Sequence, residues 1–228
     1  MKTSLRAASL LLAGACVVHC AAAQEAPHPF YLVGSVGQSR YSISKGDLDA
    51  TLFEVFAEEG LPVVPNGSTL DKTDTSWSPT VGYRFSPSFA LEASYLDLGK
   101  AQYRADGGVD FGAGFVATKI RAKIESHGPI LAALGILPFN DRWEGYVRAG
   151  VFFADTRIKV TISSFGAGTS QEVSGSSQDF FAGLGLVYNA TSNCSLRLDW
   201  QRLKNVGDKD KTGEGDIDNL TFGFVLKL

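Results

Sequence analysis

The last eleven residues, Asp218-Asn219-Leu220-Thr221-Phe222-Gly223-Phe224-Val225-Leu226-Lys227-Leu228, carry an apolar side chain at every second position from Leu220 onward. A period of two predicts a β-strand whose two faces meet different environments. The apolar face is continuous and partly aromatic, whereas the intervening positions include Gly223 and the charged Lys227. The segment also has the length of about 9–11 residues that a tilted strand needs to cross a bilayer. We therefore predict a transmembrane barrel strand, apolar toward lipid and small or polar toward the lumen.

Similar alternation occurs in seven segments upstream, so the sequence predicts eight strands. They are residues 30–41, 77–85, 89–98, 117–137, 142–162, 179–188, 194–203 and 218–228. The connections between them alternate between long and short, as in outer-membrane barrels with tight periplasmic turns and longer external loops. The predicted fold class is all-β: an eight-stranded antiparallel up-and-down transmembrane β-barrel. An even number of strands places both termini on the periplasmic side.

The longest connection, residues 42–76, contains a predicted short helix at 47–59. Asp47 can cap its N-terminus and Gly60 can end it. Its apolar face is formed by Leu48, Leu52, Phe53 and Phe56. We expect this helix to act as a structural lid on the barrel. Contact with the lipid surface or with a partner protein remains an open alternative.

Aromatic residues on the predicted outward faces gather at two levels, as in the girdles of membrane barrels. The level near the short turns consists of Phe30, Phe85, Phe89, Trp143 and Tyr188. The level near the long loops consists of Trp77, Tyr95, Phe153, Phe180 and Trp200. Residues 77 and 85 are separated by roughly 20 Å along the membrane normal at a tilt of about 40°, close to an apolar band of about 25 Å.

Four charged residues decide which face of the strands is turned inward: Glu92, Arg148, Arg197 and Asp199. In the opposite register they would face lipid, where one arginine costs roughly 2–4 kcal/mol near the midplane. We expect them to lie at similar depth in the lumen as a structural ion-pair network that neutralises buried charge. The alternative is a gate in a narrow pore, although an eight-stranded lumen is only wide enough for side chains or one small ligand.

The N-terminus predicts a signal peptide at 1–23, followed by one barrel domain at 24–228. Lys2 and Arg6 precede an apolar run at 7–18 and a small-residue cleavage site at 21–23. The signal removes two of 21 basic residues and none of 24 acidic ones, which leaves a net charge of −5. This balance gives no reason to expect nucleic-acid binding. Only Cys194 remains after cleavage, so no disulfide can form within the mature chain.

No catalytic, cofactor-binding or metal-binding residues are predicted. Ser126 and His127 point to opposite faces of a strand, which prevents an easy nucleophile–base hydrogen bond. Residues 208–213 resemble the start of a calcium-binding loop, but Asn219 occupies the position of the bidentate glutamate. We therefore expect a protein that is not an enzyme, with a lipid-modifying barrel enzyme as a third choice.

The plan resembles the transmembrane domain of the outer membrane protein A family from about residue 30 to 228. The matching motifs are 30–41, Gly82-Tyr83-Arg84-Phe85-Ser86-Pro87 with Glu92 downstream, 146–150, and Arg197-Leu198-Asp199-Trp200-Gln201 with Val206-Gly207-Asp208. The resemblance implies a lumen ion-pair network in which Glu92 and Arg197 correspond to a pair discussed as a gate. The chain is expected to lack the peptidoglycan-binding domain of the larger family members.

These features predict an integral protein of the bacterial outer membrane and cell envelope. Its leading role is structural or in surface interaction, with the external loops carrying specificity. The alternative is a porin-like conduit for ions or small solutes. Expected partners are outer-membrane lipid and lipopolysaccharide, the barrel-assembly machinery through the C-terminal strand, and a possible surface partner bound by the loops. No nucleic acid is expected.

Overall fold

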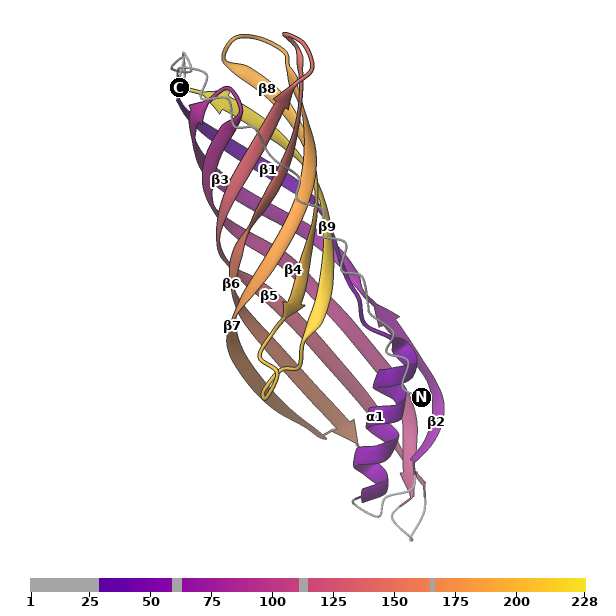
Figure 1. Cartoon of the computed structure of the whole chain (residues 1–228). Coiled ribbons are helices and arrows are strands. Elements are labelled where there is room, and N and C mark those ends of the chain that lie inside the picture. The colour runs from indigo at the N-terminus through magenta and orange to yellow at the C-terminus, as the bar shows by residue number, and fades with distance from the viewer. Residues whose placement is uncertain (1–28, 59–62, 111–114, 165–166) are drawn as a thin grey trace, which may run out of the picture.

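The computed structural model describes residues 29–58, 63–110, 115–164 and 167–228, and these residues form an almost entirely β protein (Figure 1). The predicted signal peptide at 1–23 and the predicted helix end at Gly60 lie outside the described residues. The elements are β1 (Phe30–Tyr41), α1 (Lys45–Glu58), β2 (Val63–Asp71), β3 (Thr73–Ser86), β4 (Phe89–Asp110), β5 (Phe115–Pro138), β6 (Trp143–Ser164), β7 (Ala167–Asn189), β8 (Cys194–Val206) and β9 (Gly215–Lys227).

The sheet closes on itself through antiparallel pairs. Its order is β2-β4-β3-β1-β9-β8-β7-β6-β5, and an additional pairing of β4 with β5 closes the ring. β4 pairs with β3 and, further along, with β2. Only Lys72 separates β2 from β3, so β2 continues the line of β3 along β4. The predicted eight-stranded antiparallel barrel is therefore confirmed, and β2 is a ninth strand that the sequence pattern did not indicate.

The barrel has two unlike ends. The short connections after β3, β5 and β7 lie at one, which we call the turn end, together with the C-terminus. At the other, the extended end, β4 to β7 run beyond the remaining strands and carry α1 and β2 beside them (Figure 1). The glycine- and serine-rich segments at 99–114 and 163–177 are predicted as loops by composition; that prediction was wrong, because their described residues belong to strands. Residues 111–114 and 165–166 of those loops lie outside the described part of the chain.

The extension forms because long alternating strands supply pairing partners for segments of weak strand propensity. The end of β4, from Lys100 to Asp110, pairs residue by residue with the start of β5. The start of β7, from Ala167, pairs likewise with the end of β6. Glycine and serine composition predicted loops there, but the ladder of backbone hydrogen bonds determines the structure.

A β-bulge at Gly99 exchanges the two faces of β4. The register with β5 shifts by one residue between Asp97 and Lys100. Gly99 has a φ of +65°, and a Cβ there would lie 2.7 Å from the carbonyl oxygen of Thr75, so glycine is required. Before the bulge the even-numbered residues such as Glu92 are buried, and after it the odd-numbered ones such as Tyr103 are.

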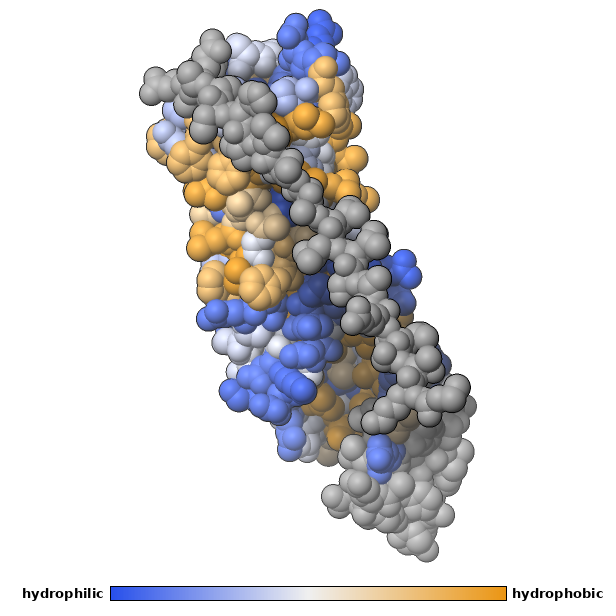
Figure 2. All heavy atoms as spheres, in the orientation of Figure 1, coloured by the Kyte–Doolittle hydropathy of each residue, from blue (hydrophilic) through white to orange (hydrophobic). Residues whose placement is uncertain are grey.

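The outward face between the two ends is apolar. The predicted girdle residues point outward, with exposures from 39% for Trp200 to 74% for Phe180 among those largely exposed. At the turn end the rings of Phe30 and Tyr83 lie 4.8 Å apart and those of Tyr83 and Phe85 lie 4.7 Å apart. Figure 2 shows the resulting apolar band, with polar residues above and below it. This is the distribution that a lipid bilayer requires.

The predicted helix is confirmed: α1 begins two residues before the predicted start at Asp47 and lies beside β2 at the extended end (Figure 1). The carboxylate of Asp49 lies 3.3 Å from Lys45 Nζ and accepts a hydrogen bond from the hydroxyl of Tyr103 in β4. Hydrogen bonds from Tyr103 and Ser68 lower the pKa of Asp49. Burial and the neighbouring Asp49 raise the pKa of Tyr103 to about 12.

Among the described residues, no helix is both long and apolar enough to cross a bilayer.

This contact predicts a limited pH range for the attachment of α1 to β4. The pKa of Asp49 is lower in the folded chain, so its contribution is complete above the unfolded pKa and is lost as pH falls through the folded pKa. The pKa of Tyr103 is raised, so its contribution is complete below its ordinary value of 10.0 and is lost as pH rises through about 12. We expect the amide NMR shifts of residues 45–58 to change at both limits. The same response in Tyr103→Phe would contradict this assignment.

Candidate functional site

The four charged residues predicted for the lumen meet on its inner wall. Glu92 projects from β4, Arg148 from β6, and Arg197 and Asp199 from β8, and all four are buried. Arg197 bridges the two carboxylates: its Nη1 contacts Glu92 Oε1 and its Nη2 lies 3.2 Å from Glu92 Oε2. Its Nε donates to Asp199 Oδ2 at 2.7 Å and its Nη2 to Asp199 Oδ1 at 2.9 Å. Such charge-assisted, multiply bonded contacts are the strong class of hydrogen bonds.

Arg148 completes the charge balance from the other side. Its Nη2 lies 3.5 Å from Glu92 Oε2 and its Nη1 lies 3.7 Å from Asp199 Oδ1. Its guanidinium lies over the ring of Phe181, 5.2 Å from the centroid. Two positive and two negative groups therefore share one buried cluster without net charge, which is the condition under which buried ions are tolerated.

Two tyrosines that the sequence did not identify belong to the same network. The hydroxyl of Tyr31 donates to Glu92 at 2.9 Å. The hydroxyl of Tyr146 donates to Asp199 and accepts from Arg197 Nε at 2.6 Å. The residue opposite Tyr31 is Gly82 and the residue opposite Tyr146 is Gly185.

Each glycine leaves the space that the neighbouring ring occupies. A Cβ at Gly82 would lie 2.1 Å from the Tyr31 ring, and one at Gly185 would lie 2.1 Å from the Tyr146 hydroxyl. The signal that could identify these tyrosines is an inward tyrosine opposite a glycine. Detecting that signal requires the strand register.

A smaller polar cluster lies between the network and the turn end. Arg84 and Glu144 form an ion pair at 3.0 Å, and Asn189 donates to the same carboxylate at 3.1 Å. Lys227 donates to Asn189 at 2.8 Å. The charged residue that interrupts the C-terminal alternation is thus satisfied by side chains inside the barrel.

Toward the extended end, the lumen changes from polar to apolar. Directly beyond the network lies a cavity of about 10 Å³, about the space of one water molecule. Ser76 donates to Asn219 there at 2.6 Å. Apolar side chains then fill the lumen, all at most 3% exposed: Leu96, Leu98, Ile130, Phe152, Phe181 and Leu203.

We call these six residues the apolar plug. Phe152 and Phe181 directly adjoin the outward girdle residues Phe153 and Phe180 in sequence, so the plug lies level with that girdle. The expected interior was small or polar, and at the level of the plug the inner face of these strands is instead apolar.

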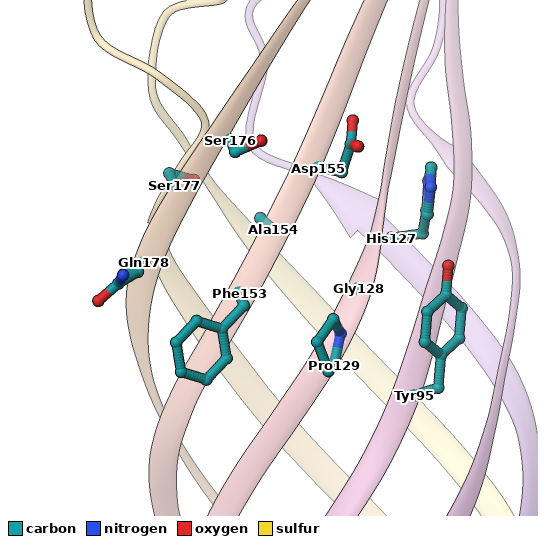
Figure 3. Close-up of a pocket in the computed structure, with 10 residues that line it drawn as sticks. All are labelled: Tyr95, His127, Gly128, Pro129, Phe153, Ala154, Asp155, Ser176, Ser177 and Gln178. Carbon is teal, nitrogen blue, oxygen red and sulfur yellow. The ribbon is translucent and has the colours of Figure 1, made fainter.

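A second candidate site lies on the outer surface at the boundary of the apolar band (Figure 3). This rim pocket has a volume of about 470 Å³. Its polar row crosses four strands, since Asp97 of β4 lies opposite His127 of β5, His127 opposite Asp155 of β6, and Asp155 opposite Ser176 of β7. Tyr95, Pro129 and Phe153 line its apolar part, and the Tyr95 hydroxyl points toward His127.

The row does not assemble a nucleophile with a base. Ser176 is paired with Asp155 rather than with His127. Asp155 lies 3.7 Å from Arg157 Nε, and Asp97 accepts from the backbone N–H of Gly99 at 2.8 Å. The prediction that Ser126 and His127 face opposite sides is confirmed, because Ser126 bonds Thr156 inside the barrel at 3.0 Å.

The residues that resemble a calcium loop do not converge either. Asp208 accepts from the backbone N–H of Asp210 at 3.0 Å and forms an ion pair with Lys211 at 3.5 Å. Asn219 lies in the lumen on β9, bonded to Ser76. Within the described ranges, no group of three or more His, Cys, Asp or Glu side chains is arranged to hold a metal ion.

The network predicts strongly non-additive mutational effects. Arg197→Gln leaves Glu92 and Asp199 with one counter-charge, so we expect a loss of about 3–5 kcal/mol in the free energy of unfolding. Glu92→Gln/Arg197→Gln restores the charge balance, and its loss should be smaller than the sum of the single losses. Urea unfolding in lipid vesicles, followed by tryptophan fluorescence, measures both.

Arg202→Gln is the matched control, because the Arg202 side chain is 42% exposed and lies 3.4 Å from Asp216. Exposed pairs of this kind contribute about 0–1 kcal/mol. The coupled buried cluster would be contradicted if the losses in the free energy of unfolding at Glu92 and Arg197 were additive. It would also be contradicted if Arg202→Gln lowered that free energy as much as Arg197→Gln.

No curated protein sequence gives a significant match. Neisserial surface protein A is 12% identical, with 87% of this chain and 97% of that chain covered and a TM-score of 0.44. Ail of Yersinia pestis is 14% identical (88% and 99% covered, TM-score 0.39), and the N-terminal β-barrel domain of Pseudomonas aeruginosa OprF is 15% identical (87% and 98% covered, TM-score 0.38). The OmpA-like transmembrane domain model matches residues 28–228, so this chain belongs to that family of outer-membrane β-barrels.

Proposed function

We propose that this outer-membrane barrel is a closed, non-enzymatic envelope protein whose extended end carries its surface interactions. The observation that supports this most directly is the filled lumen. The lumen contains the neutral ion-pair network and, beyond it, the apolar plug. A barrel filled in this way serves as a scaffold for what it displays at its ends.

The alternative of a narrow gated pore has less support. Opening the Glu92–Arg197 pair would leave Phe152, Leu96 and Leu203 across the lumen, each at most 1% exposed. An ion would have to displace this apolar layer or cross it without water. Removing a charge from water carries a large free-energy penalty. The ion-pair network is therefore proposed as a structural element that fixes the strands around it.

We further propose that the extended end faces the outside of the cell and that the termini face the periplasm. Short connections at one end and long strands with α1 at the other support this orientation, because external segments of such barrels are longer than periplasmic turns. Lipopolysaccharide then surrounds the extended end. The C-terminal strand β9, with Phe222 and Phe224 about half exposed, is the proposed contact for the barrel-assembly machinery.

Cysteine labelling on intact cells tests the orientation. In a Cys194→Ser background, Ser170→Cys places a thiol on the exposed start of β7, and Asn140→Cys places one in the turn after β5. We expect a membrane-impermeant maleimide to label position 170 on intact cells. Position 140 should react only after the outer membrane is permeabilised. The reverse pattern would overturn the orientation.

Conductance in planar bilayers tests the closed lumen. We expect the refolded mature chain, verified as folded by its gel mobility before and after boiling, to give no discrete channel openings. Reproducible openings that change in Glu92→Gln would instead support the pore and refute the closed scaffold.

A further inference from the structure

The outward face of β4, β5 and β6 beyond the rim pocket is unusually basic. We call it the cationic face. Its seven basic residues are Lys100 and Arg104 on β4, Lys119, Arg121 and Lys123 on β5, and Arg157 and Lys159 on β6. Among the side chains that the structure describes, it includes two acidic residues, Asp106 and Glu125. This excess of positive charge stands on a chain whose formal net charge is −3.

Like charges on this face are paired directly across the strands. Arg104 lies opposite Arg121, and Lys123 lies opposite Lys159. Such pairs destabilise a sheet, so the fold alone does not account for them. Glu125 lies 2.5 Å from Lys123 and compensates that charge, whereas Arg104 donates at 3.0 Å to the neutral Gln102. Glu172 of β7 lies opposite Lys159, but in the described part of the chain Arg104, Arg121 and Lys159 form no ion pair within 4.0 Å.

The cationic face also has the shape of a binding site. A hollow of about 390 Å³ lies between the basic side chains, and Arg104, Arg121, Lys123, Lys159, Gln102 and Thr161 contribute to its lining. Arginine forks match phosphate oxygens in pairs, and lysine adds a mobile point charge. The two hydroxyl and amide side chains can bond neighbouring sugar or phosphate oxygens.

The height of the hollow above the apolar band selects the kind of anion. Lys159 lies six residues beyond the girdle residue Phe153 on β6. This separation is about 20 Å along the strand, or about 15 Å along the membrane normal at a tilt of about 40°. A phospholipid headgroup layer is only about 5–8 Å thick on each side. A phosphate at the level of Lys159 must therefore be carried by a thicker headgroup.

We propose that the cationic face binds phosphate groups on the saccharide headgroup of a phosphorylated glycolipid in the surrounding leaflet. The proposal rests on the proposed surface role and assigns the lipid contact to named residues. Ligand phosphates supply the counter-charge that is missing between Arg104 and Arg121 and a further one beside Lys159, next to the existing Lys123–Glu125 ion pair. The rim pocket lies directly below, where the headgroup meets the acyl chains.

Binding to a defined glycolipid tests this assignment. The refolded mature chain in zwitterionic micelles is titrated with lipopolysaccharide that carries a phosphorylated core, and the apparent Kd is measured. We expect Arg121→Thr/Lys159→Thr to weaken binding at least tenfold. Thr suits a strand and the change removes like-charge contacts, so unfolding in micelles without glycolipid should be no easier than for the wild type. Arg121→Lys/Lys159→Arg should retain binding.

The matched control is Lys209→Thr/Lys211→Thr, which removes two charges from the loop after β8 at the same end of the barrel. It should bind like the wild type. The proposal is overturned if the control loses as much affinity as Arg121→Thr/Lys159→Thr, or if that variant stays within twofold of the wild type. It is also overturned if dephosphorylated lipopolysaccharide or phosphatidylglycerol binds equally well.

If soluble heparin binds as tightly as the phosphorylated lipopolysaccharide, the glycolipid assignment is also overturned, and the ligand class is a soluble polyanion. In a micelle both ends of the barrel are exposed to the same solution, so these outcomes do not depend on the orientation of the barrel in cells. A failure of the proposed surface role, measured by cysteine labelling, is therefore distinguishable from a failure of this site.

Discussion

The structure depends on one constraint: a strand inside a bilayer can satisfy its backbone N–H and C=O groups only through another strand. The pairing of β4 with β5 closes the ring and leaves no open edge at membrane depth. Closure then forces alternate side chains into a narrow lumen and the others into lipid. The charged network and the apolar plug fill the lumen, and the aromatic girdles match the outer surface to the lipid.

The alternation of side chains was readable from the sequence, and this is why so much of the fold was predictable. Phe222 and Phe224 could only face lipid, and Glu92 and Arg197 could only avoid it, because the opposite assignment costs several kcal/mol. That single energetic choice sets the register of every strand that carries a charge. The helix α1 was recognisable separately, from its own period of about 3.6 residues.

The parts that the sequence did not predict depend on contacts between strands. The extension of β4 and β7 arises from pairing with β5 and β6, and glycine- and serine-rich composition suggested loops there. Tyr31 and Tyr146 join the network only because glycines lie opposite them. The row through Asp97, His127, Asp155 and Ser176 has no counterpart in linear spacing, because its members come from four strands.

The single extra residue at the Gly99 bulge exchanges the inward and outward positions of every later residue in β4. Without it, Tyr103 would turn outward and Arg104 would turn toward the inside of the extended sheet. One glycine with a positive φ thus allows the outward side chains of one strand to be apolar before the bulge and polar or charged after it. In a lineage of related barrels, a one-residue insertion or deletion at this position is a route by which the exposed sheet could exchange its two surfaces while the membrane-embedded part stays unchanged.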